Sequence, residues 1–292
     1  MHCTARSRNS ESLKFLLSLF PDSQRSHCLC MKSEAGATIL HSAARSGNIK
    51  SVKLLLDHYP ESQRRQAVCA PTLDGRIVLH YAARSGNLGL VSYILSFWPK
   101  WEHLSLKSGD EKTALHFAAR SGSIESVKFL LSISPKSQRR QAVCMQTRSG
   151  HIVLHYAAMS GNLDLVKYIL SVWPESEHLQ AICMKNGRQG TVLHDAATSG
   201  NSDLIAFLLS LSQRSEHVQV MSSQDDRGMT VLHYAALSAR HRSEEVIRVI
   251  LNHCPKSELL RVVCIQDGEH NNTLMHLLSG LQQYQKNSAN KP

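Results

Sequence analysis

Short apolar segments at helical spacing, separated by glycine, proline and polar residues, make up most of the chain. Residues 153–160 are an apolar segment with a central pair of alanines, and Gly161 follows where a left-handed residue commonly ends a helix. In the next segment the apolar positions fall at i, i+3, i+6 and i+7: Leu163, Val166, Ile169 and Leu170. The pattern therefore predicts a short helix, a tight turn and a second short helix.

The same pattern returns along the chain, marked each time by a Leu-His or Met-His pair, and six copies continue with two alanines. The marker histidines are His2, His41, His80, His116, His155, His194, His233 and His276. They lie 36 to 43 residues apart, and five of the seven steps are 39 residues. A regular period of this size indicates stacked structural repeats, each too small to bury its apolar face alone.

One copy shows what kind of repeat this is. The segment Thr230-Val231-Leu232-His233-Tyr234-Ala235 follows a polar turn, Asp225-Asp226-Arg227-Gly228-Met229. It closely resembles the Thr-Pro-Leu-His-x-Ala signature of the ankyrin repeat family. The resemblance implies an all-α solenoid of helix–turn–helix units, with β-turn fingers at one edge and a concave groove that binds other proteins. We expect about seven units over residues 1–280, the first incomplete, and a disordered polar tail at 281–292.

The chain departs from that signature in three ways. Its proline is absent from every copy, and Ile77 and Ile152 replace its threonine, which removes a hydroxyl cap worth about 1 kcal/mol. The mostly 39-residue period exceeds the family's period of about 33 residues. The additional residues lie in segments such as 60–69, where a proline at a first helical position predicts a short third helix. A longer irregular loop is the alternative.

The turn near residues 238–243 should also be irregular. Ala239 stands where the other repeats have the glycine that ends the first helix, and two additional residues follow before Val246. Alanine does not readily adopt the left-handed conformation, so we expect a longer loop here.

Charge divides the chain into two unlike halves. The net charge is +10, and residues 1–146 carry 20 Lys/Arg and 10 Asp/Glu, whereas 147–292 carry 13 of each. The whole excess therefore lies in the first half, which favours an acidic partner for that half. A protein segment is the expected partner, and nucleic acid is the alternative.

The cysteines and the apolar runs bear on the cellular compartment. Five of the eight cysteines occupy an equivalent place in five repeats: Cys30, Cys69, Cys144, Cys183 and Cys264. Cysteines in such positions are typical of small buried packing residues, so we expect reduced thiols and no bound metal. Reduced thiols favour a cytoplasmic protein. No apolar run approaches the length of a membrane span.

The ankyrin resemblance also places candidate partner-binding residues. The groove positions between the alanine pair and the glycine hold Arg45, Arg84 and Arg120, followed by Met159. Adjacent repeats stack roughly 10 Å apart, so the three arginines should form a ladder. The fingers add Arg76, Lys112 and His151 beside it. The alternative is that these side chains only solvate the surface or pair with Asp74, Asp110 and Glu111.

The remaining motifs favour a scaffold over an enzyme. No nucleophile elbow, phosphate-binding loop or zinc-protease helix is present, so we expect a non-catalytic, monomeric adaptor without a cofactor. The ankyrin resemblance implies that the marker histidines hold the finger turn to the first helix through hydrogen bonds. The aromatic residues that follow them, Tyr81, Phe117, Tyr156 and Tyr234, are more typical of packing than of base stacking.

Another hypothesis is that the chain is the targeting array of a longer protein. The near-identical paired repeats resemble, in style, the ankyrin effectors that intracellular bacteria deliver into host cells.

Overall fold

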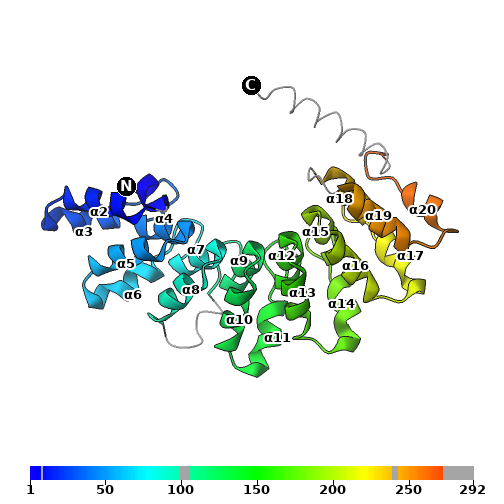
Figure 1. Ribbon diagram of the computed structural model, residues 1–292, viewed down its shortest axis with the longest axis horizontal. Coiled ribbons are helices and arrows are strands. Elements are labelled where there is room, and N and C mark those ends of the chain that lie inside the picture. Colours follow the sequence, from blue (N-terminus) through cyan, green and yellow to red (C-terminus); the bar gives the residue numbers. More distant parts are fainter. Residues whose placement is uncertain (8, 99–105, 239–242, 272–292) are drawn as a thin grey trace, which may run out of the picture. The chain divides into compact units, whose positions relative to one another are not determined.

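The computed structural model describes residues 1–7, 9–98, 106–238 and 243–271 (Figure 1). The chain divides into two compact bodies, Met1–Arg148 and Ser149–Pro292, and each is described by itself. The expected tail at 281–292, Trp101 and the marker His276 lie outside the described residues. Within those residues, no helix is both long and apolar enough to cross a membrane.

The N-terminal body consists of helices grouped by repeat. They are α1 (His2–Arg6), α2 (Ser10–Ser18) and α3 (Asp22–Cys30); α4 (Ile39–Ser46), α5 (Ile49–Asp57) and α6 (Glu61–Cys69); α7 (Val78–Ser85) and α8 (Leu88–Leu95); and α9 (Ala114–Ser121), α10 (Ile124–Ser132) and α11 (Lys136–Cys144). The first helices α1, α4, α7 and α9 pack one against the next.

The C-terminal body repeats this arrangement. Its elements are α12 (Val153–Ser160), α13 (Leu163–Leu170), the 3₁₀ turn η2 (Glu175–Glu177) and α14 (His178–Cys183); α15 (Val192–Ser199), α16 (Ser202–Ser210) and α17 (Arg214–Ser222); and α18 (Val231–Leu237), α19 (Ser243–His253) and α20 (Leu259–Val263). Its first helices α12, α15 and α18 are again neighbours.

A third helix follows the first two in both bodies, which confirms the helix and excludes the irregular loop. It is seen as α3, α6, α11, α14, α17 and α20. The proline is the residue before the helix rather than its first residue: Pro60 precedes α6 with an extended backbone. In the α7–α8 repeat the corresponding segment includes residues 99–105, which lie outside the described residues.

The core runs between neighbouring repeats. The alanine pair of six first helices, α4, α7, α9, α12, α15 and α18, is almost wholly buried; in α4, for example, Ala43 and Ala44 are both 0% exposed. Because alanine has no side chain beyond Cβ, the first helices can approach closely and bury the leucine before each marker histidine. Leu79, Leu115 and Leu154 are all 0% exposed.

Glycine ends the first helices as the pattern predicts. Five C-caps are left-handed, with φ between 71° and 76°: Gly47, Gly86, Gly122, Gly161 and Gly200. Helix α18 differs, because it stops at Leu237 and its C-cap Ser238 has an extended backbone (φ −62°, ψ 108°). The rest of the turn expected to be irregular, residues 239–242, lies outside the described residues.

The fingers are joined by backbone hydrogen bonds from one repeat to the next. In the N-terminal body, Leu73 N–H donates to Ala35 O (3.1 Å), Gly109 N–H to Asp74 O (2.7 Å) and Arg148 N–H to Asp110 O (3.0 Å). These bonds hold the finger edge in register with the stacked first helices, so the finger and groove positions of neighbouring repeats share one surface.

Gly75 is the position where this finger edge tolerates least change. It has φ +70°, and a Cβ there would lie 2.8 Å from the Gly109 nitrogen. We expect Gly75→Ala to lower the free energy of unfolding by about 1–3 kcal/mol, because it adds backbone strain and disturbs the Gly109–Asp74 bond. Urea unfolding measures the change.

Gly89 provides the matched control in the same body. It lies in helix α8 without a positive φ, and a Cβ there would meet its nearest neighbour at 3.4 Å. Gly89→Ala should therefore raise stability by about 0.4–1 kcal/mol. Equal effects of the two substitutions would contradict the finger geometry.

Candidate functional site

The marker histidines join three parts of each repeat. In six repeats Nδ1 accepts a hydrogen bond from the backbone N–H three residues earlier, at 3.1 or 3.2 Å. Because Nδ1 accepts a hydrogen bond, the ring proton is on Nε2. This Nε2 faces a backbone carbonyl; in His41 it lies 3.0 Å from the oxygen of Ala70, the residue just after α6. The histidine therefore ties the finger, the first helix and the end of the third helix together.

Burial keeps three of these rings, those of His41, His80 and His194, in the neutral form. Desolvation by burial lowers the pKa of His41 and of His80 to about 4, although hydrogen bonds to backbone carbonyls act in the opposite direction. Burial also lowers the pKa of His194. Neutral, doubly bonded imidazoles have no free proton-transfer atom, so their role is structural, as predicted.

The residue before each first helix has a smaller part in this junction. Thr38, Thr113, Thr191 and Thr230 place Oγ1 2.8 or 2.9 Å from the histidine Nδ1. Where isoleucine replaces threonine, the backbone bond remains, as from Ile77 N–H to His80 Nδ1 (3.1 Å). These repeats therefore lack the hydroxyl contact but keep the link between finger and helix.

The aromatic residue after the marker histidine packs on the preceding repeat. Tyr81 meets His41 at 5.5 Å between ring centroids, and Phe117 meets His80 at 5.3 Å. In the C-terminal body Tyr234 meets His194 at 5.3 Å. These contacts confirm the packing interpretation, since the rings lie against neighbouring imidazoles.

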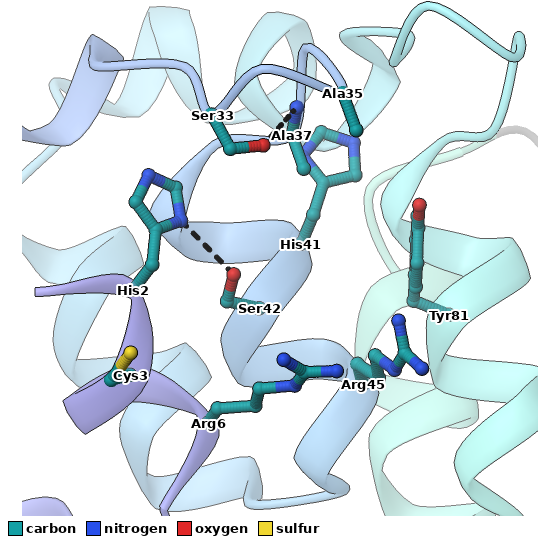
Figure 2. Close-up of a pocket in the computed structure, with 10 residues that line it drawn as sticks. All are labelled: His2, Cys3, Arg6, Ser33, Ala35, Ala37, His41, Ser42, Arg45 and Tyr81. Atoms are coloured by element: carbon teal, nitrogen blue, oxygen red, sulfur yellow. Dashed lines mark hydrogen bonds between the residues drawn. The ribbon is translucent and has the colours of Figure 1, made fainter.

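The groove positions of the N-terminal body hold exposed arginines. Arg45, Arg84 and Arg120 lie in the last turns of α4, α7 and α9, and the structure shows no ion pair for them with any described residue. Arg6 occupies the same position in α1 and is also exposed. We call Arg6, Arg45, Arg84 and Arg120 the arginine ladder; Figure 2 shows Arg6 and Arg45 extending beside each other.

Arg6 was missed as a site residue, although the sequence contained the signal for it. Residues 2–31 align with 116–145, and this alignment places Arg6 over Arg120. The first repeat therefore contributes a fourth member to the surface.

The finger cations, in contrast, are neutralised by nearby acids. Arg76 Nε lies 3.0 Å from Asp74 Oδ2, and Arg76 Nη2 lies 3.8 Å from Asp110 Oδ2. Lys112 Nζ lies 2.6 Å from Asp110 Oδ2. Burial alone would raise the pKa of Asp110, but hydrogen bonds from Lys112 and Ser108 and the charges of Lys112 and Arg76 hold it below its ordinary value. Arg76 and Lys112 therefore pair with nearby acids, which is the alternative that the sequence left open for these two residues.

The two comparisons with family profiles agree with this geometry. A profile described as "Ankyrin repeats (3 copies)" matches residues 60–139, 79–180 and 154–261, and one described as "Ankyrin repeat" matches residues 35–63. The chain belongs to the ankyrin repeat family. Ankyrin repeats are in general protein–protein interaction modules, and such scaffolds are typically non-catalytic. A search of the curated proteins gave no match.

The remaining predicted site residues belong to the C-terminal ankyrin body. His151 is part of a finger: its Nδ1 lies 2.9 Å from Ser149 Oγ, and its Nε2 lies 3.1 Å from Asn186 Nδ2. Met159 is half-buried at the groove position of α12. Neither contributes a charge comparable to the arginine ladder.

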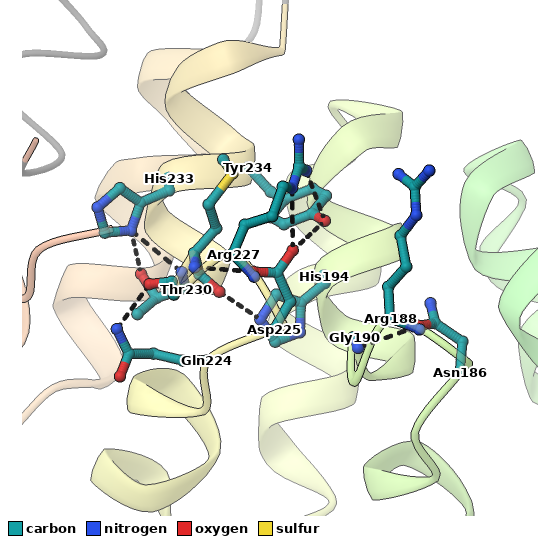
Figure 3. A network of polar contacts seen from close by, with 12 residues as sticks. Asn186, Arg188, Gly190, His194, Gln224, Asp225, Arg227, Thr230, His233 and Tyr234 are labelled. Carbon is teal, nitrogen blue, oxygen red and sulfur yellow. Dashed lines mark hydrogen bonds and ion pairs between the residues drawn. The ribbon is translucent and has the colours of Figure 1, made fainter. Parts of the chain in front are cut away.

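A polar network supports another finger of the C-terminal body (Figure 3). Asp225 Oδ1 accepts hydrogen bonds from the N–H groups of Arg227 (2.9 Å) and Met229 (2.8 Å), and Oδ2 accepts one from Tyr234 Oη (2.7 Å). Burial alone would raise the pKa of Asp225, but these hydrogen bonds and Arg227 keep it below its ordinary value. The network stabilises an ankyrin turn and leaves its carboxylate fully engaged.

Several basic residues of the third helices also have structural roles. Arg25 Nε donates to Leu17 O (2.9 Å), and Arg64 Nε donates to Tyr59 O (3.3 Å). Arg139 Nη2 donates to Ser132 O (3.4 Å). Each bond satisfies a carbonyl at or just after the end of a second helix, which docks the third helix onto it.

Metal ligation is not seen in the described part of the chain, where no three His, Cys, Asp or Glu side chains form a group suited to an ion. Once the finger pairs and the third-helix bonds are assigned, the arginine ladder is the set of exposed cations that recurs at one position of four successive repeats in the N-terminal body.

Proposed function

We propose that the N-terminal body binds an acidic segment of a partner protein along the face formed by α1, α4, α7 and α9. The observation that supports this most strongly is the contrast between the two sets of cations on one surface. Arg76 and Lys112 are paired with acids, whereas the arginine ladder is exposed and has no ion pair with a described residue.

Four like charges at one position of successive repeats repel one another, and a negative ligand would relieve that repulsion. Arginine suits carboxylates because its planar guanidinium presents parallel N–H donors that can bind both carboxylate oxygens. The stack sets the spacing, since adjacent helices pack about 8–10 Å apart. An acidic segment lying across the helices can therefore meet the ladder one arginine at a time.

The test compares two quadruple variants. The first changes the ladder to glutamate: Arg6→Glu, Arg45→Glu, Arg84→Glu and Arg120→Glu. The control changes four exposed cations of the same body away from the ladder: Lys50→Glu, Arg65→Glu, Lys136→Glu and Arg140→Glu. Both variants have the same net charge, so a difference between them reports the position of the charges.

The probe is an unlabelled twelve-residue peptide of Asp, Glu, Gly and Ser, titrated by calorimetry. The ladder variant should lose about 30- to 1000-fold in affinity, because each reversed contact costs about 0.5–1 kcal/mol. The control should lose much less, and both should keep the parent's circular dichroism and melting temperature. Equal losses in the two variants would show that overall charge, not the ladder, attracts the peptide.

Single-stranded DNA serves as the competing probe. If DNA binds more tightly than the acidic peptide, with a steep salt dependence that the ladder variant abolishes, the ladder is a nucleic-acid site and the proposal is wrong.

A further inference from the structure

A hollow lies at the start of the arginine ladder (Figure 2). Its volume is about 200 Å³, and it is bounded by α1, α4, the first finger and the Tyr81 ring of α7. The side chains that matter for its chemistry are His2, Cys3, Arg6, Ser42, Arg45 and Tyr81. All of them belong to the N-terminal body.

The hollow lies where the α4 repeat has no ring at a position that is aromatic in four other repeats. The position after the marker histidine holds tyrosine or phenylalanine in α7, α9, α12 and α18, and in α7 and α9 that ring packs on the histidine of the preceding repeat. In α4 the same position is Ser42. Its hydroxyl lies 3.0 Å from His2 Nδ1, so a hydroxyl faces His2 where the next repeats place a ring.

The polar side chains of His2, Ser42 and Ser33 at the hollow are already hydrogen-bonded. His2 Nδ1 meets Ser42, and the other side of the ring faces the backbone carbonyl of Met31. Ser33 Oγ accepts a hydrogen bond from the Ala37 N–H at 3.2 Å. An apolar group can therefore enter without leaving these polar atoms unsatisfied.

The volume of the hollow and the arginines beside it indicate what kind of ligand it could bind. A cavity of about 150 Å³ is known to hold a benzene ring, so this volume suits one aromatic side chain. Arg6 and Arg45 are exposed beside it, and arginine attracts both aromatic faces and carboxylates.

We propose that the hollow takes an aromatic side chain of the acidic segment, which fills the place that Tyr81 and Phe117 fill in the next two repeats. This inference rests on the proposed function and adds a recognition element to it. The partner is then an acidic segment in which a phenylalanine or tyrosine is flanked by Asp or Glu. The ring packs against His2 and Tyr81, while the flanking carboxylates meet Arg6 and Arg45.

Two matched peptides test this. One is an acidic twelve-residue peptide with a central phenylalanine, and its twin has alanine at that position. The phenylalanine peptide should bind the parent protein about 10- to 100-fold more tightly in calorimetry, because the twin buries no ring.

Filling the hollow from within should abolish that difference. Ser42→Tyr supplies the ring that α7 carries, so it should reduce the affinity for the phenylalanine peptide to that for the twin, and leave binding of the twin unchanged. Ser42→Ala keeps the hollow open and should preserve the preference. Circular dichroism verifies that both variants fold.

A second measurement uses the unmodified protein. Cys3 is exposed at the hollow, whereas Cys183 is exposed in the C-terminal body. At equal saturation, the phenylalanine peptide should slow alkylation of Cys3 by iodoacetamide more than the twin does, with no effect on Cys183, as mass spectrometry of the labelled peptides would show.

The outcomes separate this inference from the proposed function. If both peptides bind equally and both depend on the ladder, the acidic-segment function stands and the aromatic pocket is wrong. If neither peptide binds, both proposals are wrong. Unchanged Cys3 alkylation under saturating phenylalanine peptide would also overturn the pocket.

Discussion

Lowering the pH from 7 to 4 is expected to destabilise the N-terminal body by about 5 kcal/mol. His41 and His80 have pKa values of about 4 in the folded protein, because burial disfavours the charged ring, whereas the ordinary value is 6.5. The unfolded chain therefore takes up protons that the folded chain does not. At about 1.4 kcal/mol for each pKa unit, each histidine contributes about 2–3 kcal/mol by pH 4.

The direction of the effect follows from the lowered pKa. The stabilisation is fully present above pH 6.5 and is lost as the pH falls from 6.5 towards 4. Urea unfolding followed by circular dichroism at pH 7.5, 6, 5 and 4 measures it. The pKa of Asp110 lies below its ordinary value of 3.8, so the stability that this carboxylate contributes is lost at still lower pH.

Two substitutions assign the pH dependence to the marker position. His80→Gln should roughly halve the loss of stability between pH 7 and 4, although the variant starts from lower stability. His41→Gln should have a similar effect, because the His41 ring is buried at the equivalent position and burial lowers its pKa in the same way. A parent profile that runs parallel to that of His80→Gln would contradict this account.

Replacing Leu154 with alanine should lower the free energy of unfolding by about 2–5 kcal/mol. Leu154 is 0% exposed in α12, and truncating such a side chain loses transfer free energy and leaves a cavity. Because each repeat contacts mainly its neighbours, the damage should remain local. Hydrogen exchange should show protection falling first in α12, α13 and α15.

Leu237→Ala is the matched control in the same body. Leu237 is 47% exposed at the end of α18, so its truncation should cost less than about 1 kcal/mol. A uniform loss of protection across α12–α19 in the Leu154 variant would contradict nearest-neighbour coupling.

Local patterns were enough to predict most of the fold. The spacing of apolar residues after Gly161 and the glycine itself located α12, its left-handed cap and α13, because these features depend on residues close in sequence. The repeat period also predicted the third helix, since a proline followed by a short polar and apolar segment recurs at equal offsets.

Charge pairing could be predicted only in part. The sequence places Arg45, Arg84 and Arg120 at one position of successive repeats, and the structure shows them exposed. The sequence also grouped Arg76 and Lys112 with these arginines. In the structure, however, Arg76 forms ion pairs with Asp74 and Asp110, and Lys112 forms one with Asp110. Asp110 belongs to the repeat after Arg76, so their pairing depends on how two fingers stack.

By itself, the sequence determined the all-helical repeat architecture, because each helix, cap and turn is encoded within a few residues and copied at a regular interval. Tertiary structure decided which charges stay exposed and where the surface is hollow. Those properties arise between repeats: the 3.0 Å contact of His2 with Ser42 and the 3.8 Å pair of Arg76 with Asp110 each join residues more than thirty positions apart. Such distances are set by packing, and no local pattern specifies them.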